Sequence, residues 1–195
     1  GSEMCIRDRR GICAEDAFSA HGKRAFIMSH VLDMTGAPIV LVSAVPVLRS
    51  MGYEVLVLGP SDGGSLHLFL DAGASVITRS SCRNVSDAWG MALCADFVIA
   101  NTVVMARAVR ALSGTAVPVL WWLHDAFAGY PHIAHQIPTQ LGENVRVYSV
   151  GSHAANAMHA VRPDFQIGQL IYGLPDYAAE DFPPVSYTHL RAHET

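Results

Sequence analysis

Short apolar segments alternate with longer amphipathic segments along most of the chain. The apolar segments have no polar alternation, which is typical of strands buried on both faces of a sheet. Strands are expected at 24–30, 54–60, 74–78, 96–101, 118–124, 145–150 and 166–172. The alternation predicts an α/β fold, a Rossmann-like parallel sheet of about six to seven strands with helices on both faces.

The segments between the strands carry the helical period. Helices are expected at 38–51, 65–72, 84–94, 102–112, within 126–143 and at 153–161. In the first of them Leu41, Val45 and Leu48 recur at i, i+4 and i+7, so this face should be buried. Pro46 predicts a kink inside that helix, and Gly52 should end it.

The connection between the first strand and the first helix is the most distinctive stretch of the sequence. It reads Thr35-Gly-Ala-Pro38. Gly36 can adopt a positive φ and lets a ligand approach the backbone, and Pro38 suits the first turn of a helix. A strand, a glycine turn and a helix N-terminus together offer backbone N–H groups to an anion. An ordinary strand-to-helix turn is the alternative interpretation.

Polar residues follow several of the expected strands. In a parallel sheet, ligands bind beyond the carboxyl ends of the strands, which lie on one rim. That rule selects 29–36, 61–64, Asn101, Thr102, His124, Asp125, Gly151 and Ser152. Helix capping is the alternative interpretation of Asn101, Thr102 and Asp125, and a solvated loop carboxylate is that of Asp33.

Composition narrows the partners and the compartment. The chain has 195 residues and a formal net charge of −4 without a basic cluster, so no nucleic-acid partner is expected. Its four cysteines have no metal-ligand spacing, which predicts a reduced, cytoplasmic protein without a metal site. No apolar run reaches the roughly 18 residues that a membrane span needs.

The two ends of the chain match a sequencing adaptor of the transposase type. Residues 1–9 correspond to one translated strand of the adaptor, and residues 185–195 correspond to the opposite strand. We therefore expect both ends to be adaptor-derived and exclude them from the fold prediction. Residues 10–23 show no clear period and are expected to be a disordered leader.

Four segments in order carry a resemblance to a known family. They are Ser29–Pro38, Gly52–Gly63, Asp96–Thr102 and Val119–Asp125. Together they resemble the N-terminal domain of family 4 glycosyltransferases, over about residues 24–176. The resemblance implies the GT-B architecture, in which two Rossmann-like domains face a cleft. The chain would then hold the acceptor-side domain and, at 177–184, the start of the interdomain linker, while the C-terminal donor-binding domain is absent.

The resemblance also implies an activity and a set of site residues. Such enzymes move a sugar from a nucleotide-sugar donor to a saccharide or lipid-linked acceptor, typically with retention and without a bound metal or other cofactor. Gly36 and Ala37 match the loop that approaches the donor diphosphate, and His124 and Asp125 match catalytic positions. Acceptor or sugar contacts are implied at Asp33, Thr35, Asn101, Thr102 and Ser152. Peripheral contact with the inner face of a membrane is an expectation for the full-length enzyme.

Two other functions stay open on the sequence alone. One is a stand-alone Rossmann or flavodoxin-like module that binds a small ligand, although no Gly-x-Gly-x-x-Gly motif supports a dinucleotide. The other is a sugar-nucleotide epimerase with the same two-domain architecture. If the transferase interpretation is right, the fragment alone should be inactive.

Overall fold

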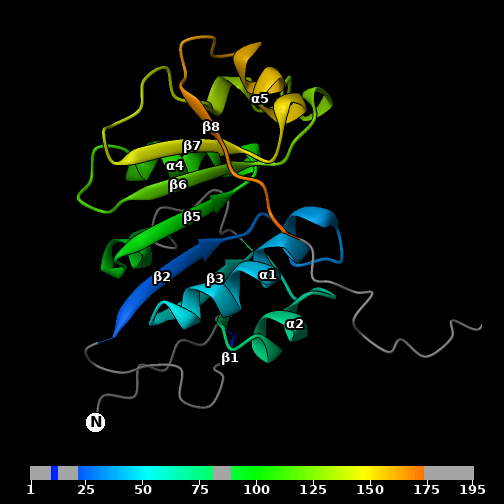
Figure 1. Cartoon of the computed structure of the whole chain (residues 1–195), viewed down its shortest axis with the longest axis vertical. Coiled ribbons are helices and arrows are strands. Elements are labelled where there is room, and N and C mark those ends of the chain that lie inside the picture. The colour runs from blue at the N-terminus through cyan, green and yellow to red at the C-terminus, as the bar shows by residue number, and fades with distance from the viewer. Residues whose placement is uncertain (1–9, 13–21, 81–88, 174–195) are drawn as a thin grey trace, which may run out of the picture.

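The computed structural model describes residues 10–12, 22–80 and 89–173, which form an eight-stranded sheet with helices on both faces (Figure 1). The strands are β1 (Arg10–Ile12), β2 (Lys23–Met28), β3 (Tyr53–Gly59), β4 (Ser75–Thr78), β5 (Phe97–Asn101), β6 (Val119–Leu123), β7 (Val145–Ser149) and β8 (Ile167–Gln169). Strands β2 to β8 are mutually parallel, and this confirms the predicted α/β sheet. The two ends that are expected to be adaptor-derived, and the segment 177–184 that is expected to begin a linker, lie outside the described residues.

The order of the strands locates the place where a ligand should bind. The sheet runs β1-β4-β3-β2-β5-β6-β7-β8, so the chain builds outward from β2 to β4 and then continues on the other side of β2. Strands β2 and β5 pair directly, with Ala25 opposite Phe97 and Met28 opposite Ala100. The order therefore reverses between β2 and β5, and the crevice beyond the carboxyl ends of these strands is the expected ligand site.

Each face of the sheet has its own apolar core. Helices α1 (Gly36–Ser50) and α2 (Leu66–Asp71) cover one face, and α4 (Ala106–Leu112) and α5 (Ser152–His159) cover the other. Leu41, Val45 and Leu48 are all buried, as their spacing predicts. Trp121 and Trp122 are consecutive in β6 and enter opposite cores, because side chains alternate across a strand.

The predicted disordered leader is wrong for its first residues. Arg10–Ile12 form β1, which pairs antiparallel with β4 at the edge of the sheet. An exposed strand edge offers unpaired backbone groups, and a three-residue strand can satisfy them without any side-chain period. Sequence patterning therefore had no signal to detect. Residues 13–21 of the expected leader lie outside the described residues.

Several helix predictions need correction at their ends or in their type. Residues 126–143 hold only two short 3-10 turns, Phe127–Gly129 and Ala134–Gln136, since Pro131 and Pro138 interrupt any longer helix. Of the helix expected at 84–94, Met91–Cys94 is a 3-10 turn and 84–88 lie outside the described residues. The last strand, expected at 166–172, is limited to β8.

The loop after β3 packs directly on the loop between β2 and α1. A Cβ atom added to Gly63 would lie 2.1 Å from the Leu32 carbonyl oxygen, and that oxygen accepts the Ser65 N–H at 2.9 Å. Gly59 is equally crowded, because its Cβ would lie 2.4 Å from Leu32 Cγ. Glycine thus allows the two loops to touch, and the contact fixes the entry to α1.

We expect Gly63→Ala to lower the free energy of unfolding by about 2 kcal/mol, since the new methyl group forces the two loops apart. Urea unfolding followed by circular dichroism measures the change. Gly90→Ala is the matched control, because Gly90 has helical dihedral angles and a Cβ there meets nothing within 4 Å. Equal stability of the two variants would show that the loops are not in close contact.

Candidate functional site

The N-terminus of α1 lies at the carboxyl end of β2 and has no side-chain cap. Thr35 occupies the capping position with an extended backbone, but its hydroxyl donates instead to Asp33 Oδ1 at 2.5 Å. The Thr35 N–H also donates to Asp33 Oδ1, at 3.1 Å. The first turn of α1 holds no acidic residue. The helix N-terminus therefore keeps its partial positive charge and its free amides for an anion.

Gly36 opens α1 without any need for a positive φ. Among the described glycines only Gly52, Gly73 and Gly114 have positive φ, so the conformational freedom expected at Gly36 is not used. A Cβ on Gly36 would meet nothing within 4 Å. Neither the backbone conformation nor the packing of the described chain requires glycine here. The space beside Gly36 is open to a ligand that approaches the backbone.

His124 follows β6 and lies beside Trp122, with a separation of 4.9 Å between ring centroids. Burial, and secondarily the charge of His30, lower the pKa of His124 to about 4. Its Nε2 atom is buried and has no hydrogen-bond partner within the described part of the chain. At pH 7 the imidazole is therefore neutral, with one N–H to donate and one nitrogen to accept. Those are the properties of a group that binds a hydroxyl.

The Asp125 carboxylate lies against the end of β5 and not against the segment that follows Asp125 in the chain. Its Oδ2 accepts the Val103 N–H at 2.5 Å, which places the carboxylate at the start of the turn that leads into α4. Burial raises the pKa of Asp125, and the backbone hydrogen bond from Val103 acts in the opposite direction. The interpretation that Asp125 caps the segment after β6 is therefore wrong, because its carboxylate instead accepts the first N–H of the turn that follows β5.

Asn101 and Thr102 end β5 and are enclosed. Their exposed fractions are 0% and 1%. Both polar atoms of the Asn101 side chain and the Thr102 hydroxyl lack hydrogen-bond partners among the described residues. Thr102 has φ 72° and does not begin a helix as predicted: a 3-10 turn, Val103–Met105, precedes α4. A residue at positive φ is outside the helical region, and this explains the delayed start.

The remaining predicted residues lie on the same rim at different depths. Asp33 and Thr35 are exposed on the β2–α1 loop, beside the open end of α1. The Thr35 hydroxyl, partly offset by desolvation, lowers the pKa of Asp33, so the carboxylate is ionised at neutral pH. Ser152 is exposed at the start of α5, after β7, and is separated from β2 by β5 and β6. The switch point thus brings together the first loop and the ends of β5 and β6, with Ser152 further along.

Two residues of this rim received no prediction of their own. His30 lies within the selected segment 29–36, two residues after the end of β2, and its charge lowers the pKa of both Asp33 and His124, which indicates that it lies near both. Its position at a strand end was the available signal. Tyr130 is 1% exposed, and burial and the Asp125 charge raise the pKa of its hydroxyl. It comes from an irregular loop, where no sequence period marks a residue as buried.

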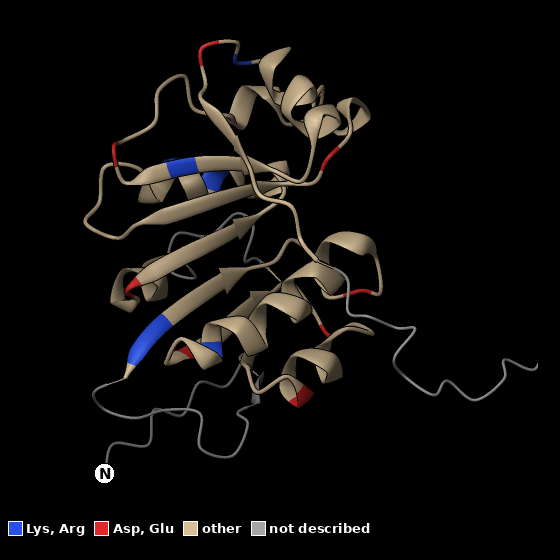
Figure 2. Cartoon of the chain, viewed as in Figure 1, with Lys and Arg blue, Asp and Glu red and all other residues tan. Residues whose placement is uncertain are grey.

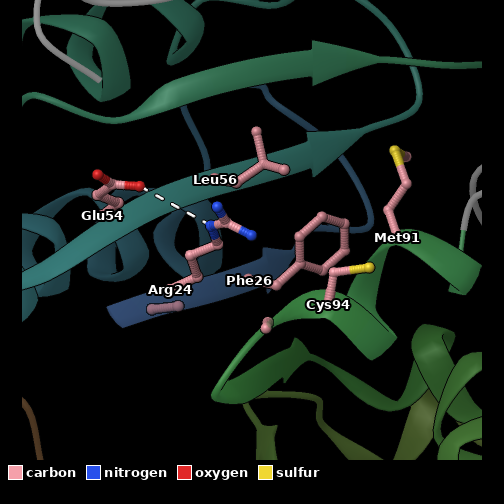
Figure 3. A pocket seen from close by; sticks show the side chains of 8 residues that line it. Arg24, Phe26, Glu54, Leu56, Met91 and Cys94 are labelled. Atoms are coloured by element: carbon pink, nitrogen blue, oxygen red, sulfur yellow. Dashed lines mark ion pairs between the residues drawn. The ribbon is translucent and has the colours of Figure 1, made fainter. Parts of the chain in front are cut away.

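A hollow at the opposite ends of the strands does not belong to this site (Figure 3). It measures about 320 Å³ and lies at the amino ends of β2 and β3, where Phe26, Leu56 and Met91 form an apolar wall. Arg24 and Glu54 form an ion pair there, with 3.9 Å between Nε and Oε2. Ligands of parallel sheets bind at the carboxyl ends, so this hollow is not the candidate site.

The charge, the potential metal ligands and the helix lengths of the described residues bear on the partners that the protein can bind. Figure 2 shows acidic and basic residues scattered over the ribbon, with no basic cluster on the described elements. Residues 10–12, 22–80 and 89–173 hold no group of three or more His, Cys, Asp or Glu side chains suited to a metal ion. In the same ranges no helix combines the length and the apolar character that a membrane span requires.

Comparison with known proteins adds a family and a fold. A family model described as Glycosyl-transferase family 4 matches residues 21–162, and no curated protein sequence matches the chain. The structure is similar to that of Anabaena Alr3699/HepE in complex with UDP and glucose, with 15% identity and a TM-score of 0.60 over 79% of this chain and 45% of that one. It is also similar to an alpha-glucosyltransferase in complex with UDP and a 13-mer DNA containing an HMU base, with 10% identity and a TM-score of 0.55 over 78% of this chain and 43% of that one. The chain spans less than half of either structure, and the likeness confirms the predicted fold class, the Rossmann-like half of a GT-B fold.

Proposed function

Because the chain belongs to glycosyl-transferase family 4, we propose that it is the acceptor-side half of an enzyme that transfers a sugar from a nucleotide-sugar donor to a saccharide or lipid-linked acceptor. The similar structures are about twice as long as the matched region, which supports a second, donor-binding domain in the full-length protein. The transfer proceeds with retention and without a metal ion in this proposal.

The open N-terminus of α1 is the observation that carries the proposal. Its amides are uncapped, its first turn holds no carboxylate, and Gly36 leaves room for a close approach. A diphosphate leaving group gains negative charge as the glycosidic bond breaks, and fixed N–H dipoles stabilise that charge. Both similar structures are complexes with UDP, which carries such a diphosphate. We therefore assign Gly36 and Ala37 to the donor diphosphate.

His124 is assigned to the transferred sugar. Its neutral imidazole and unpartnered Nε2 suit a sugar hydroxyl, which both donates and accepts hydrogen bonds. Asp33, Thr35 and Ser152 are assigned to the acceptor or sugar, since all three are exposed on the rim. Asn101 and Thr102 lie below this surface and would support the sugar from beneath.

The experiment that tests the proposal is a transfer assay on the full-length polypeptide. Release of nucleoside diphosphate from a panel of UDP- and GDP-sugars, with simple saccharides and lipid-linked saccharides as acceptors, should require the complete protein. We expect the 195-residue chain alone to be inactive. Transfer by this chain alone would contradict the assignment of the donor site to a missing half. Nanomolar nucleotide binding by the chain, with no transfer by the full-length protein, would favour a stand-alone binding module.

Gly36→Ala and Gly36→Val distinguish an effect on donor binding from an effect on folding at the α1 N-terminus. Alanine should leave the free energy of unfolding unchanged or raise it by up to about 1 kcal/mol, because glycine is the weaker helix former and the space is open. Both side chains should raise KM for the donor in the full-length enzyme, with the larger effect from valine. Urea unfolding and steady-state kinetics measure the two quantities, and an unchanged KM in the stable valine variant would remove Gly36 from the donor site.

A further inference from the structure

Thr102 has the most unusual backbone conformation in the described part of the chain. Its φ is 72° and its ψ is 166°, and it is the one non-glycine residue with positive φ in the described ranges. This region of φ/ψ space is essentially reserved for glycine, and a β-branched side chain is especially disfavoured there. Such a conformation persists only where the surrounding structure holds it in place.

Four hydrogen bonds hold Thr102 and the peptide group that follows it. One runs from the Met105 N–H to the Thr102 carbonyl oxygen at 3.4 Å, and the other three involve β6 or the residues just after it. The Thr102 N–H donates to the Trp122 carbonyl oxygen at 2.8 Å, as part of the sheet. The Trp121 indole N–H donates to the Thr102 carbonyl oxygen at 2.8 Å. The next backbone N–H, that of Val103, donates to Asp125 Oδ2 at 2.5 Å. Hydrogen bonds therefore fix the backbone on both sides of Thr102, and two of these bonds are made by the side chains of Trp121 and Asp125.

We propose that Trp121 and Asp125 form a clamp that holds Thr102 in a glycine-like conformation, and that Asp125 is a positioning residue rather than a catalytic one. The Asp125 oxygen that faces the turn already accepts a backbone N–H, so its evident task is to hold that turn. The role of the clamp in sugar transfer rests on the proposed function. The clamp itself is a property of the fold and stands apart from it.

The clamp determines the position of a neutral polar group of the site. The Asn101 side-chain amide and the Thr102 hydroxyl are buried and have no partner among the described residues, although buried polar groups are normally paired. An amide and a hydroxyl supply donors and acceptors without charge. That chemistry suits the hydroxyl groups of a saccharide better than an anion. The strained backbone of Thr102 therefore lies where the site would support an uncharged, polyhydroxylated ligand.

A double-mutant cycle on the 195-residue chain tests the clamp without any assumption about activity. Asp125→Ala should raise the equilibrium constant of unfolding only about fivefold, because release of the strain at Thr102 partly offsets the loss of the hydrogen bond to the Val103 N–H. Thr102→Gly removes the strain and should change the constant less than about fivefold. In the glycine background no strain is left to release, so the effect of Asp125→Ala should rise to about thirtyfold. Equal effects of Asp125→Ala in the two backgrounds would overturn the clamp.

Trp121→Phe gives a second, independent arm of the same cycle. Phenylalanine keeps most of the packing and removes the indole N–H that binds the Thr102 carbonyl. Its effect on unfolding should also be larger in the Thr102→Gly background, where no strain is left to offset the loss of the hydrogen bond. Trp122→Phe is the matched control, because its indole N–H donates to Leu170 and its side chain packs in the other core. Equal coupling of both tryptophans to Thr102 would show that the measured effect is not specific to the clamp.

Kinetics of the full-length enzyme separate positioning from catalysis. Asp125→Asn keeps an oxygen that accepts the Val103 N–H, so kcat should stay within about threefold and the pH profile should not move. Asp125→Ala should lower kcat. Since Thr102→Gly also removes a hydroxyl assigned to the sugar, rescue is judged against Thr102→Gly alone: the fold-loss caused by Asp125→Ala should be smaller in the glycine background. If Asp125→Asn loses as much activity as Asp125→Ala, with no rescue by glycine, the carboxylate is catalytic and the proposal is wrong. A parent enzyme without transferase activity would refute the proposed function, whereas the unfolding cycle still decides the clamp.

Discussion

His124→Ala in the full-length enzyme is expected to lower kcat by at least about a hundredfold while the fold stays intact. Removing one well-placed hydrogen-bonding group that acts on the reacting sugar typically costs a factor of 100 to 1,000. The buried, unpartnered Nε2 of His124 has no task inside the described structure that would explain its position after β6. Initial rates with the nucleotide-sugar that supports the fastest transfer measure the effect.

His124→Gln is the control for this experiment, since glutamine retains an N–H donor and an oxygen acceptor without an imidazole. If the histidine acts by hydrogen bonding alone, His124→Gln should recover part of the lost rate. Equal loss in both variants would indicate that the position of the ring against Trp122 matters as well. Full activity of His124→Ala would exclude the residue from the reaction and weaken the assignment of the whole rim.

Sequence patterning was sufficient for the architecture because a parallel sheet imposes strong constraints. Its strands are buried on both faces, so each appears as a short apolar run, and the amphipathic segments between them must cross over. The carboxyl ends of parallel strands share one rim, which predicts that 29–36, Asn101 and His124 lie on the same side of the sheet. The order β3-β2-β5-β6 brings their strands together. Burial of Leu41, Val45 and Leu48 followed from helical spacing alone.

Features that depend on backbone geometry could not be predicted from the pattern of hydrophobic and polar residues. The sequence Asn101-Thr102-Val103 does not predict a threonine at positive φ. That conformation depends on Trp121 in β6 and on Asp125 just after β6. The strand β1 likewise depends on an open edge of β4 and not on its own composition. Tyr130 lies in the irregular segment after β6 and is buried in the core that α4 and α5 cover. In each case the deciding partner is distant in the sequence.

The free energy of unfolding should fall as the pH decreases from about 6.5 towards 4, and His124 should account for much of the loss. Its pKa is lowered to about 4 in the folded chain, against 6.5 for an ordinary histidine. The unfolded chain therefore binds a proton in this window that the folded chain excludes, which favours unfolding. The contribution is fully present above pH 6.5 and decreases as the pH falls, by about 2 kcal/mol in all, since each pKa unit is worth about 1.4 kcal/mol and part of the ring contacts solvent.

His124→Gln isolates this contribution when both proteins are unfolded with urea at intervals between pH 7 and pH 4.5. Asp125 acts with the opposite sign, because a raised carboxyl pKa stabilises the folded chain as the pH falls, but it is present in both proteins and cancels in the difference. His30, whose charge contributes to the lowered pKa of His124, is present in both proteins. His153→Gln, at an exposed position on α5, is the control for the loss of an imidazole as such. If His124→Gln follows the parent at every pH, the His124 imidazole is not desolvated, and the neutral hydrogen-bonding role assigned to it would lose its physical basis.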